Sequence, residues 1–412
     1  MSAVAPVCVD VAIVGGGMVG ASLALALAGT RMRVALIEAV RADAAGQASF
    51  DERTTALGNG SQRILETLGV WAQLAAHAAP VREIQVSEAG QPGAARLRAA
   101  DQGLAALGYV VPNRQIGAAL WQALQQHSGE LELRVPARVQ AAHFEAQHVR
   151  LQVVASNAPA SGSEEIQARL VVAADGALSL LAQRAGIASV VEDYQQVAVV
   201  VHVATDRPAN GIAYERFTPS GPLAVLPLCD GRYTVVWTLT PERASEVLAL
   251  ADESFIAQLQ QCFGWRVGRM LRVGARASYP LRLSRAESVQ GPRLALVGNA
   301  AQALHPVAGQ GFNLGLRDAA LLAEILVAAD DPGAPAVLED YQRRRATDRR
   351  GMIGFTDGLV KLFASERAGA ALVRSLGLQL FDLLPGAKRA MARVSWGFGT
   401  QTPRLMRGLR LG

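Results

Sequence analysis

Cysteine is scarce in this chain of 412 residues. The three cysteines, Cys8, Cys229 and Cys262, lie singly and far apart. This spacing matches neither the paired ligands of a zinc site nor the clustered cysteines of a disulfide-bonded domain. We therefore expect no metal centre and no disulfide framework, which is typical of a protein in the reducing cytoplasm.

Concentrated positive charge is also lacking. The formal net charge is only +5, and the sequence contains no lysine-rich tract. Proteins that bind nucleic acids usually carry a dense basic patch, so we expect no nucleic-acid partner. No lysine or arginine precedes Arg31, and the start of the chain therefore lacks the pattern of a signal peptide.

Long hydrophobic runs free of polar groups are absent as well. Residues 11–30 and 294–316 carry no formal charge and are long enough to cross a bilayer. However, the first run contains Gly15, Gly16, Gly17 and Gly20, and the second contains several amide side chains. In lipid these segments would leave hydrogen-bonding groups unpaired, so we expect no membrane span.

The residues that are present predict an α/β protein. Half of them are hydrophobic, and 412 residues exceed the size of one simple core. Residues 10–14 and 33–38 have the apolar pattern of buried strands, and residues 21–28 between them have that of a helix. Together they predict a βαβ unit at the start of the chain.

The turn of this unit has the spacing G-x-G-x-x-G. Gly15 allows the tight turn, Gly17 lets a pyrophosphate approach the backbone, and Gly20 permits close packing of helix on strand. Met18 and Val19 open the helix, where free N–H groups and the helix dipole attract an anion. This pattern predicts a dinucleotide site.

An acidic residue completes this pattern. Glu38 ends the second strand about twenty residues on, where an acid is expected to bond a ribose hydroxyl. A glycine-rich turn in an unrelated α/β fold is the alternative interpretation.

A second glycine-rich segment, residues 298–318, lies near the other end of the chain. Gly298 allows close backbone approach, and Asn299 can bond ribitol or phosphate oxygens. Gly309 and Gly311 free the chain to wrap a planar ring. The helix that begins near Phe312 and Asn313 aims N–H groups at that ring, where they can stabilise an anion. Two such segments predict one extended anionic cofactor held at two points, and hence FAD.

The same segment contains the residues we expect nearest the flavin, His305, Pro306 and Gly309. His305 is either a structural histidine beside a proline turn or lies near the reacting ring. Pro306 stiffens the loop. None of them is assigned as a catalytic base.

Two further positions are candidates for the cofactor site. Arg53 is placed to reach the pyrophosphate, with a surface arginine in a solvated loop as the alternative. Asp175 and Gly176 follow an apolar strand, and an ordinary Asp-Gly turn is the alternative there. Tyr214, Phe217 and Trp237 in a β-rich stretch either line a pocket or belong to the sheet core.

The predicted domain organisation is discontinuous. A Rossmann-like FAD-binding domain comprises residues 1–75, 101–185 and 276–345. A β-rich substrate domain with an antiparallel sheet comprises residues 76–100 and 186–275. Residues 346–412 form a helical C-terminal region, whose basic residues alternate with apolar ones. That tail either rests on a membrane or partner or extends into solvent.

These motifs resemble those of the group A flavin-dependent aromatic hydroxylases, which have the para-hydroxybenzoate hydroxylase fold. The resemblance covers nearly the whole chain and is strongest at residues 11–28, 51–71, 171–179 and 296–318. Within that family the chain is most similar to the ubiquinone-biosynthesis branch, and there to the 2-polyprenyl-6-methoxyphenol hydroxylases of the UbiH type. Residues 215–237, 263–268 and 341–363 carry this finer resemblance.

The resemblance implies one non-covalent FAD, reduction by NADPH or another donor, and O₂ as co-substrate. It implies that a flavin 4a-hydroperoxide transfers one oxygen atom to the ring of a polyprenyl phenol, and it favours the cofactor role for Asp175. It further implies a cytoplasmic enzyme at the inner face of the membrane or in a ubiquinone-synthesis complex. The chain lacks a second dinucleotide fingerprint for the nicotinamide.

The chain departs from the superfamily at two positions. Gly298-Asn299 stands where most members have Gly-Asp, and Gln302 where many have His. In the family both positions lie against FAD, and we interpret the change as a mark of the subtype.

Two other functions remain open. One is a sister hydroxylase acting at another ring position, or a related flavin epoxidase or reductase. The other is a non-catalytic, flavin-binding scaffold of a lipid-synthesis complex. A flavin halogenase is disfavoured because the segment G-W-x-W-x-I-P is absent.

Overall fold

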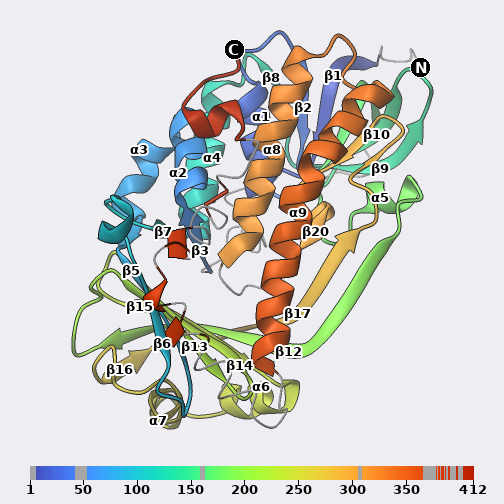
Figure 1. The fold of residues 1–412 in the computed structure, drawn as a ribbon. Coiled ribbons are helices and arrows are strands. Elements are labelled where there is room, and N and C mark those ends of the chain that lie inside the picture. The colour runs from blue at the N-terminus through green and yellow to red at the C-terminus, as the bar shows by residue number, and fades with distance from the viewer. Residues whose placement is uncertain are drawn as a thin grey trace.

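Two large sheets and a set of helices make up the molecule (Figure 1). The computed structural model describes residues 6–41, 53–157, 163–304 and 309–364, the last of these with side chains to residue 358. It also describes residues 377, 379, 380, 382–384, 386, 388, 389, 396, 397 and 402–412. The expected mixed α/β class is confirmed.

The first sheet has eight strands and a parallel centre. Its strands run in the order β18-β19-β11-β1-β2-β8, with the hairpin β9-β10 attached to β11. The central pairs of β1 with β2 and β11 are parallel, and these strands are apolar on both faces because helices cover the sheet. The strands are β1 (Val7–Val14), β2 (Val34–Ile37), β8 (Leu131–Arg134), β9 (Ala137–Phe144), β10 (Val149–Ala155), β11 (Ser163–Ala173), β18 (Gln290–Gly291) and β19 (Leu294–Leu296).

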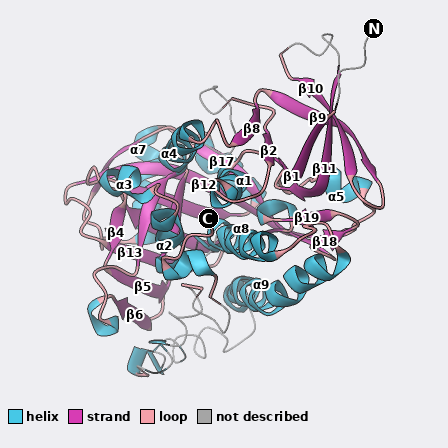
Figure 2. Cartoon of the chain, turned by 90° about the horizontal axis from the view of Figure 1, so that it is seen from above, coloured by secondary structure: helices cyan, strands magenta, loops and turns pink. Residues whose placement is uncertain are grey.

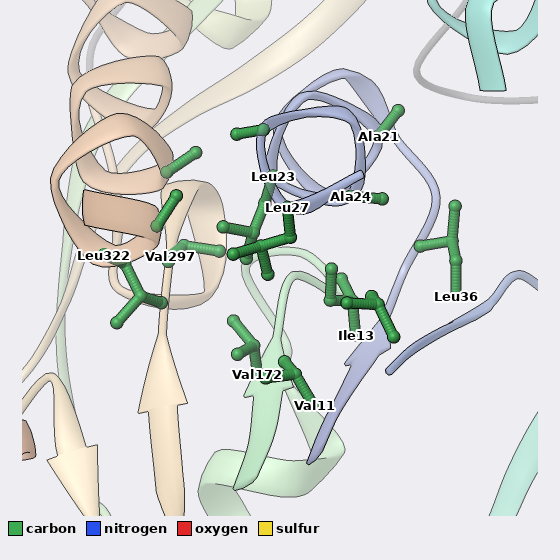
Figure 3. Close-up of a cluster of buried hydrophobic side chains, with 14 of the residues drawn as sticks. Val11, Ile13, Ala21, Leu23, Ala24, Leu27, Leu36, Val172, Val297 and Leu322 are labelled. Carbon is green, nitrogen blue, oxygen red and sulfur yellow. The ribbon is translucent and has the colours of Figure 1, made fainter. Parts of the chain in front are cut away.

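Helix α1 (Met18–Leu27) packs on this sheet at the centre of the larger core. Its sequence is apolar on all sides, as expected of a helix surrounded by protein. Figure 3 shows Leu23 and Leu27 of α1 lying between Leu322 of a neighbouring helix and Ile13 and Val172 of the sheet. That neighbour, α8 (Gln310–Ala328), brings the second glycine-rich segment beside the first.

The remaining helices surround the two sheets. They are α2 (Asn59–Thr67), α3 (Trp71–Leu74), α4 (Asn113–Gln126), α5 (Leu180–Arg184), α6 (Pro241–Leu248), α7 (Asp252–Phe263) and α9 (Pro335–Ala364), with 3₁₀ turns η1 (Ala75–His77), η2 (Ala100–Gln102), η4 (Gly298–Ala300) and η6 (Arg404–Arg407). Helices α8 and α9 lie side by side (Figure 2).

The second sheet has nine strands and is antiparallel except where β5 pairs with β13. Its order is β20-β17-β12-β15-β14-β13-β5-β6, with β16 beside β12. The strands are β5 (Glu83–Glu88), β6 (Ala94–Arg98), β12 (Ser189–Thr205), β13 (Ile212–Thr218), β14 (Gly221–Pro227), β15 (Tyr233–Leu239), β16 (Met270–Val273), β17 (Ala277–Ala286) and β20 (Gln302–Ala303). A small sheet, β3 (Thr54–Gly58), β7 (Gly108–Pro112) and β4 (Ala79–Val81), completes the set.

One face of the second sheet is covered by helices that the sequence analysis did not predict. Trp237 packs edge to face on Phe255 of α7, with ring centroids 5.9 Å apart, and Tyr214 packs likewise on Phe263. A start signal for α6 was present in the sequence, since Thr240 caps the helix and Pro241 is its first residue.

Helix α9 runs past both sheets (Figure 1), and the predicted boundary at residues 345/346 falls inside it. Among the residues that the structure describes, no helix is both long and apolar enough to span a bilayer.

Candidate active site

Four parallel strands of the first sheet end at the same edge, and each is followed by a predicted site residue. Gly15 follows β1, Glu38 follows β2, Asp175 follows β11 and Gly298 follows β19. Because ligands of open α/β sheets bind outside the carboxyl ends of the strands, this edge is the expected binding site. The strand order therefore brings together residues that are 283 positions apart in sequence.

A cavity of about 1290 Å³ opens at this edge and extends to the second sheet. Small-molecule sites usually measure about 300–1,000 Å³, so this cavity has room for a large cofactor together with a substrate. The predicted residues on its wall are Gly15, Gly17, Met18, Val19, Glu38, Arg53, Asp175, Asn299, Gly309, Gly311 and Phe312. Gly20, Gly298 and Asn313 do not reach the wall, and His305 and Pro306 lie outside the described residues.

The first glycine turn has no space for side chains. A Cβ on Gly15, whose φ is +105°, would lie 2.3 Å from the carbonyl oxygen of Ala174. A Cβ on Gly20 would lie 1.9 Å from that of Gly15, so Gly20 holds α1 against the turn. Gly17 precedes α1 and provides no side-chain cap, which leaves the first N–H groups of the helix available to an anion.

Glu38 is fixed beside this turn. Its Oε2 accepts a hydrogen bond from the Gly16 N–H at 2.5 Å, and its Oε1 accepts one from the Val40 N–H at 2.9 Å. A carboxylate can accept about four hydrogen bonds, so capacity remains for a ribose hydroxyl. The carboxylate is thus held in the position that a nucleotide site requires.

Asp175 is an incompletely paired buried carboxyl. Among the described residues its Oδ1 has no hydrogen-bond partner, and burial raises the pKa of this carboxyl. A buried polar atom without a partner is costly unless a ligand supplies one. Since Asp175 lines the cavity, polyhydroxyl groups of a cofactor are suitable partners, and this favours the site role over that of an ordinary turn.

Arg53 lies at the cavity and not on an isolated surface loop. Its guanidinium carbon is 4.5 Å from the ring centroid of Tyr279 on β17. This stacking holds the positive charge of Arg53 at the wall, where it can pair with an anionic group of a cofactor.

The second glycine segment touches the first. A Cβ on Gly298, whose φ is +58°, would lie 3.0 Å from Val19 of α1. Gly309 has a φ of +61° and precedes α8 without a side-chain cap, so the N-terminus of α8 opens toward the cavity. A Cβ on Gly311 would meet no atom of the described residues within 4 Å, which leaves open space for a ring at this point of the wall.

Asn313 supports the segment from behind the wall. Its Nδ2 donates to the carbonyl oxygens of Ala56 at 2.8 Å and Gly309 at 2.7 Å, and its Oδ1 accepts from the Gly58 N–H at 2.9 Å. These bonds tie the start of α8 to β3. The side chain therefore positions the loop, and the predicted role of Asn313 at the cofactor stays with the N–H groups at the start of the helix.

A buried ionic network under this segment was missed by the sequence analysis. Asp318 accepts hydrogen bonds from the Gly298 N–H at 3.1 Å, Gln302 Nε2 at 2.7 Å and Arg345 Nε at 2.7 Å. Gln302 in turn accepts from Arg349 Nε at 2.8 Å. The side chain of Gln302 is thus engaged beneath the loop and does not line the cavity, although the family resemblance placed it against FAD.

The part of the wall formed by the second sheet is mostly apolar. It includes Ala213, Phe217, Ala224, Leu226 and Val236. Among the predicted aromatic residues, Tyr214 and Phe217 therefore line the pocket, and Tyr214 also packs on Phe263, whereas Trp237 belongs to the sheet core described above. Glu215 of β13, which the sequence analysis did not identify, is the carboxyl that lies among these residues.

Comparison with known proteins agrees with this geometry. The family described as FAD binding domain matches residues 8–356. The chain is 40% identical to the ubiquinone hydroxylase UbiL of Rhodospirillum rubrum, over 98% of this chain and 93% of UbiL. It is 35% identical to the 3-demethoxyubiquinol 3-hydroxylase of Escherichia coli, over 94% and 98% of the two chains.

The fold is also that of a solved monooxygenase. The structure of p-nitrophenol 4-monooxygenase PnpA from Pseudomonas putida DLL-E4 superposes with a TM-score of 0.79, covering 96% of this chain and all of PnpA at 19% identity. The glycine turn, Glu38, Asp175 and the open space at Gly311 suit an FAD molecule that extends along the sheet edge. The chain therefore belongs to the FAD-dependent monooxygenases, in the branch that contains the ubiquinone hydroxylases, and its cofactor is FAD.

Proposed function

We propose that this chain hydroxylates the aromatic ring of 2-polyprenyl-6-methoxyphenol in ubiquinone biosynthesis, using O₂ and a reduced donor such as NADPH. The observation that carries the proposal is the single cavity that joins both glycine segments to the apolar wall of the second sheet. An apolar wall suits a prenylated ring because each buried methylene contributes about 0.8 kcal/mol. The ubiquinone hydroxylases among its relatives support the same substrate class.

The wall residues divide the task of holding FAD. Gly15, Gly17 and the start of α1 would bind the pyrophosphate together with Arg53, Glu38 would bind the ribose, and Asp175 and Asn299 would bind ribityl oxygens. Bound FAD supplies the redox chemistry by which O₂ delivers one oxygen atom to the ring. The free N–H groups at the N-terminus of α8 would stabilise negative charge on a bound flavin ring, each contributing about 1.5–3 kcal/mol.

We also propose a peripheral contact with the inner face of the membrane or with a ubiquinone-synthesis complex, because the substrate is lipid-soluble. The exposed Arg404, Arg407 and Arg410 are suited to anionic lipid. Leu405 and Met406 are buried in the protein, so these two apolar residues of the tail do not face a membrane. Met391 and Phe398, two other apolar residues of this tail, lie outside the described residues.

Filling the open space at Gly311 is expected to prevent FAD binding without unfolding the protein. In Gly311→Leu the new side chain enters the cavity, because no atom of the described residues lies in that direction. Stability of the apoprotein should change by at most about 1 kcal/mol, the difference in helix propensity between glycine and leucine. Titration of apoprotein with FAD and a urea melt measure the two effects.

Gly351→Leu is the matched control. Gly351 lies in α9, and a Cβ there also meets no atom within 4 Å, yet it does not line the cavity. This variant should bind FAD like the wild type. Equal FAD affinity of both variants would contradict the placement of the flavin beside Gly311.

Product analysis tests the proposed reaction. The purified yellow protein should consume O₂ in the presence of NADPH and 2-geranyl-6-methoxyphenol, and NMR of the product gives the ring carbon that is hydroxylated. Hydroxylation of a demethoxyubiquinol-type substrate, and not of 2-geranyl-6-methoxyphenol, would identify a sister hydroxylase of the kind that the name of the E. coli relative describes. A yellow protein that shows no O₂ uptake dependent on any phenol in this series would be a flavin-binding scaffold.

A further inference from the structure

Glu215 lies on the part of the cavity wall that is formed by the second sheet. It lies on β13, where Ala213 and Phe217, two residues before and after it, also line the cavity. Its register partners are Val86 on β5 and Ala224 on β14, and both line the cavity as well. The side chain is therefore set in an apolar surface formed by three adjacent strands.

This carboxyl is unpaired within the described part of the chain. Among the described residues nothing donates a hydrogen bond to it or forms an ion pair with it, whereas neighbouring Arg216 on the opposite face donates to the carbonyl oxygen of Cys262. Burial raises the pKa of Glu215 to about 7. An unpaired carboxyl in an apolar surface lowers the stability of the fold. This cost is offset when a bound ligand supplies the missing hydrogen-bond donor.

The chemistry of the proposed substrate identifies that donor. An ionised carboxylate only accepts hydrogen bonds. In a prenylated methoxyphenol the prenyl chain and the methoxy group have no O–H or N–H, so the phenolic hydroxyl is the single donor. The glycine segments that hold FAD belong to the first sheet, and Glu215 faces the same cavity from the second.

We propose that Glu215 accepts a hydrogen bond from the phenolic hydroxyl of the substrate and thereby orients the ring in the cavity. The inference rests on the proposed function, because it requires a phenol as substrate. It makes Glu215 a substrate-binding residue that determines which ring carbon faces the flavin.

Binding of a phenol and of its methyl ether tests the hydrogen bond without turnover. The probes are 2-geranyl-6-methoxyphenol and the compound in which its hydroxyl is methylated, each titrated into the oxidised holoenzyme and followed by calorimetry. The wild type should bind the phenol about 10- to 100-fold more tightly than the ether, as expected for a hydrogen bond to a charged group. In Glu215→Leu this preference should fall below about threefold.

Two further variants test whether the preference for the phenol comes from the carboxylate of Glu215. Glu215→Gln keeps the shape and a neutral acceptor, so its preference should lie between the other two. Glu83→Gln is the matched control, because Glu83 of β5 does not line the cavity and its Oε2 accepts from Arg98 Nε at 3.2 Å. This control should retain the full preference for the phenol.

The pH dependence of binding provides an independent measurement. Phenol affinity of the wild type should rise between pH 6 and 8 as Glu215 ionises, because an ionised acceptor forms the stronger bond. The affinity of Glu215→Gln should stay flat over this range. The other ionisable residues on the described cavity wall are Glu38, Arg53, Arg96, Tyr109, Arg138, Asp175, Arg184 and Tyr214, and Glu88 of β5 and Asp357 of α9 lie on neighbouring elements; all of them are retained in the variant.

The outcomes separate the two proposals. If Glu215→Leu, or Glu215→Gln where the leucine variant does not fold, retains the full preference for the phenol, the role of Glu215 is refuted and the proposed reaction stands. If the wild-type holoenzyme binds neither compound, the proposed substrate class is wrong and the role of Glu215 is refuted with it.

Discussion

Replacing Arg345 with methionine is expected to lower the free energy of unfolding by about 3–5 kcal/mol. Arg345 and Asp318 are only 4% and 2% exposed. Arg345 donates to Asp318 from Nε at 2.7 Å and to Asp348 from Nη1 at 2.6 Å. Methionine preserves much of the volume but leaves the two carboxylates without this cation, and the cost of an uncompensated buried charge dominates. Urea melts of the apoprotein measure the change.

The effect should extend to the cofactor loop. Asp318 also accepts from the N–H of Gly298 and from Gln302, so its displacement frees the segment that follows β19. We expect the variant to retain less FAD after gel filtration than the wild type. The flavin absorbance per mole of protein gives this content directly.

The stability of Arg345→Met should also respond differently to acid from that of the wild type. Burial by itself would raise the pKa of Asp348, but the guanidinium groups of Arg317 and Arg345 outweigh it and lower that pKa below the ordinary value of 3.8. A lowered carboxyl pKa stabilises the fold above the unfolded pKa, and this contribution is lost as pH falls through the folded pKa. Below pH 4 the wild type should therefore lose stability more steeply than Arg345→Met.

The neighbouring arginine is the matched control. Arg344 lies on the same helix, but its ion pairs with Glu324 at 3.3 Å and Asp340 at 3.7 Å are partly exposed. Because exposed pairs contribute at most about 1 kcal/mol, Arg344→Met should be nearly neutral. Equal losses in the two variants would show that burial of the network is not what stabilises this region.

Local patterns predicted the cofactor side of the site. The turn at Gly15, the acid at Glu38 and the helix after Gly309 depend on residues close in sequence, and the parallel sheet places their strand ends at one edge. Periodicity in the same way predicted the strands of the second sheet, since apolar and turn residues alternate there.

The residues on the substrate side of the cavity could not be predicted from local patterns, because their positions depend on tertiary structure. Whether Glu215 faces the cavity or the α7 core is set by the register of β13 with β5 and β14, and a shift of one residue would reverse it. Likewise Asp318 and Arg345 meet only because α8 and α9 pack together. A signal for this pair was present, because Arg317 and Asp318 stand within the apolar stretch 314–323 of α8 and buried charges require partners.

Adding one methyl group at Gly20 is expected to abolish measurable FAD binding. A Cβ there would lie 1.9 Å from the carbonyl oxygen of Gly15 and 3.1 Å from the Cβ of Ala174, so α1 must move away from the turn. This movement withdraws the N-terminal N–H groups of α1 from the pyrophosphate. Two charge-assisted hydrogen bonds of about 1.5–3 kcal/mol each correspond to a loss of affinity of at least about 100-fold.

The stability of Gly20→Ala should fall, although alanine is the better helix former. Helix propensity alone would favour alanine by about 1 kcal/mol, whereas overpacking costs about 1–3 kcal/mol. Gly351→Ala in α9 isolates the first effect, because its Cβ meets no atom, and it should be slightly stabilised with unchanged FAD affinity. Fluorescence titration of both apoproteins with FAD, beside urea melts, tests the pair. Wild-type affinity in Gly20→Ala would mean that the contact between α1 and the glycine turn does not hold the cofactor.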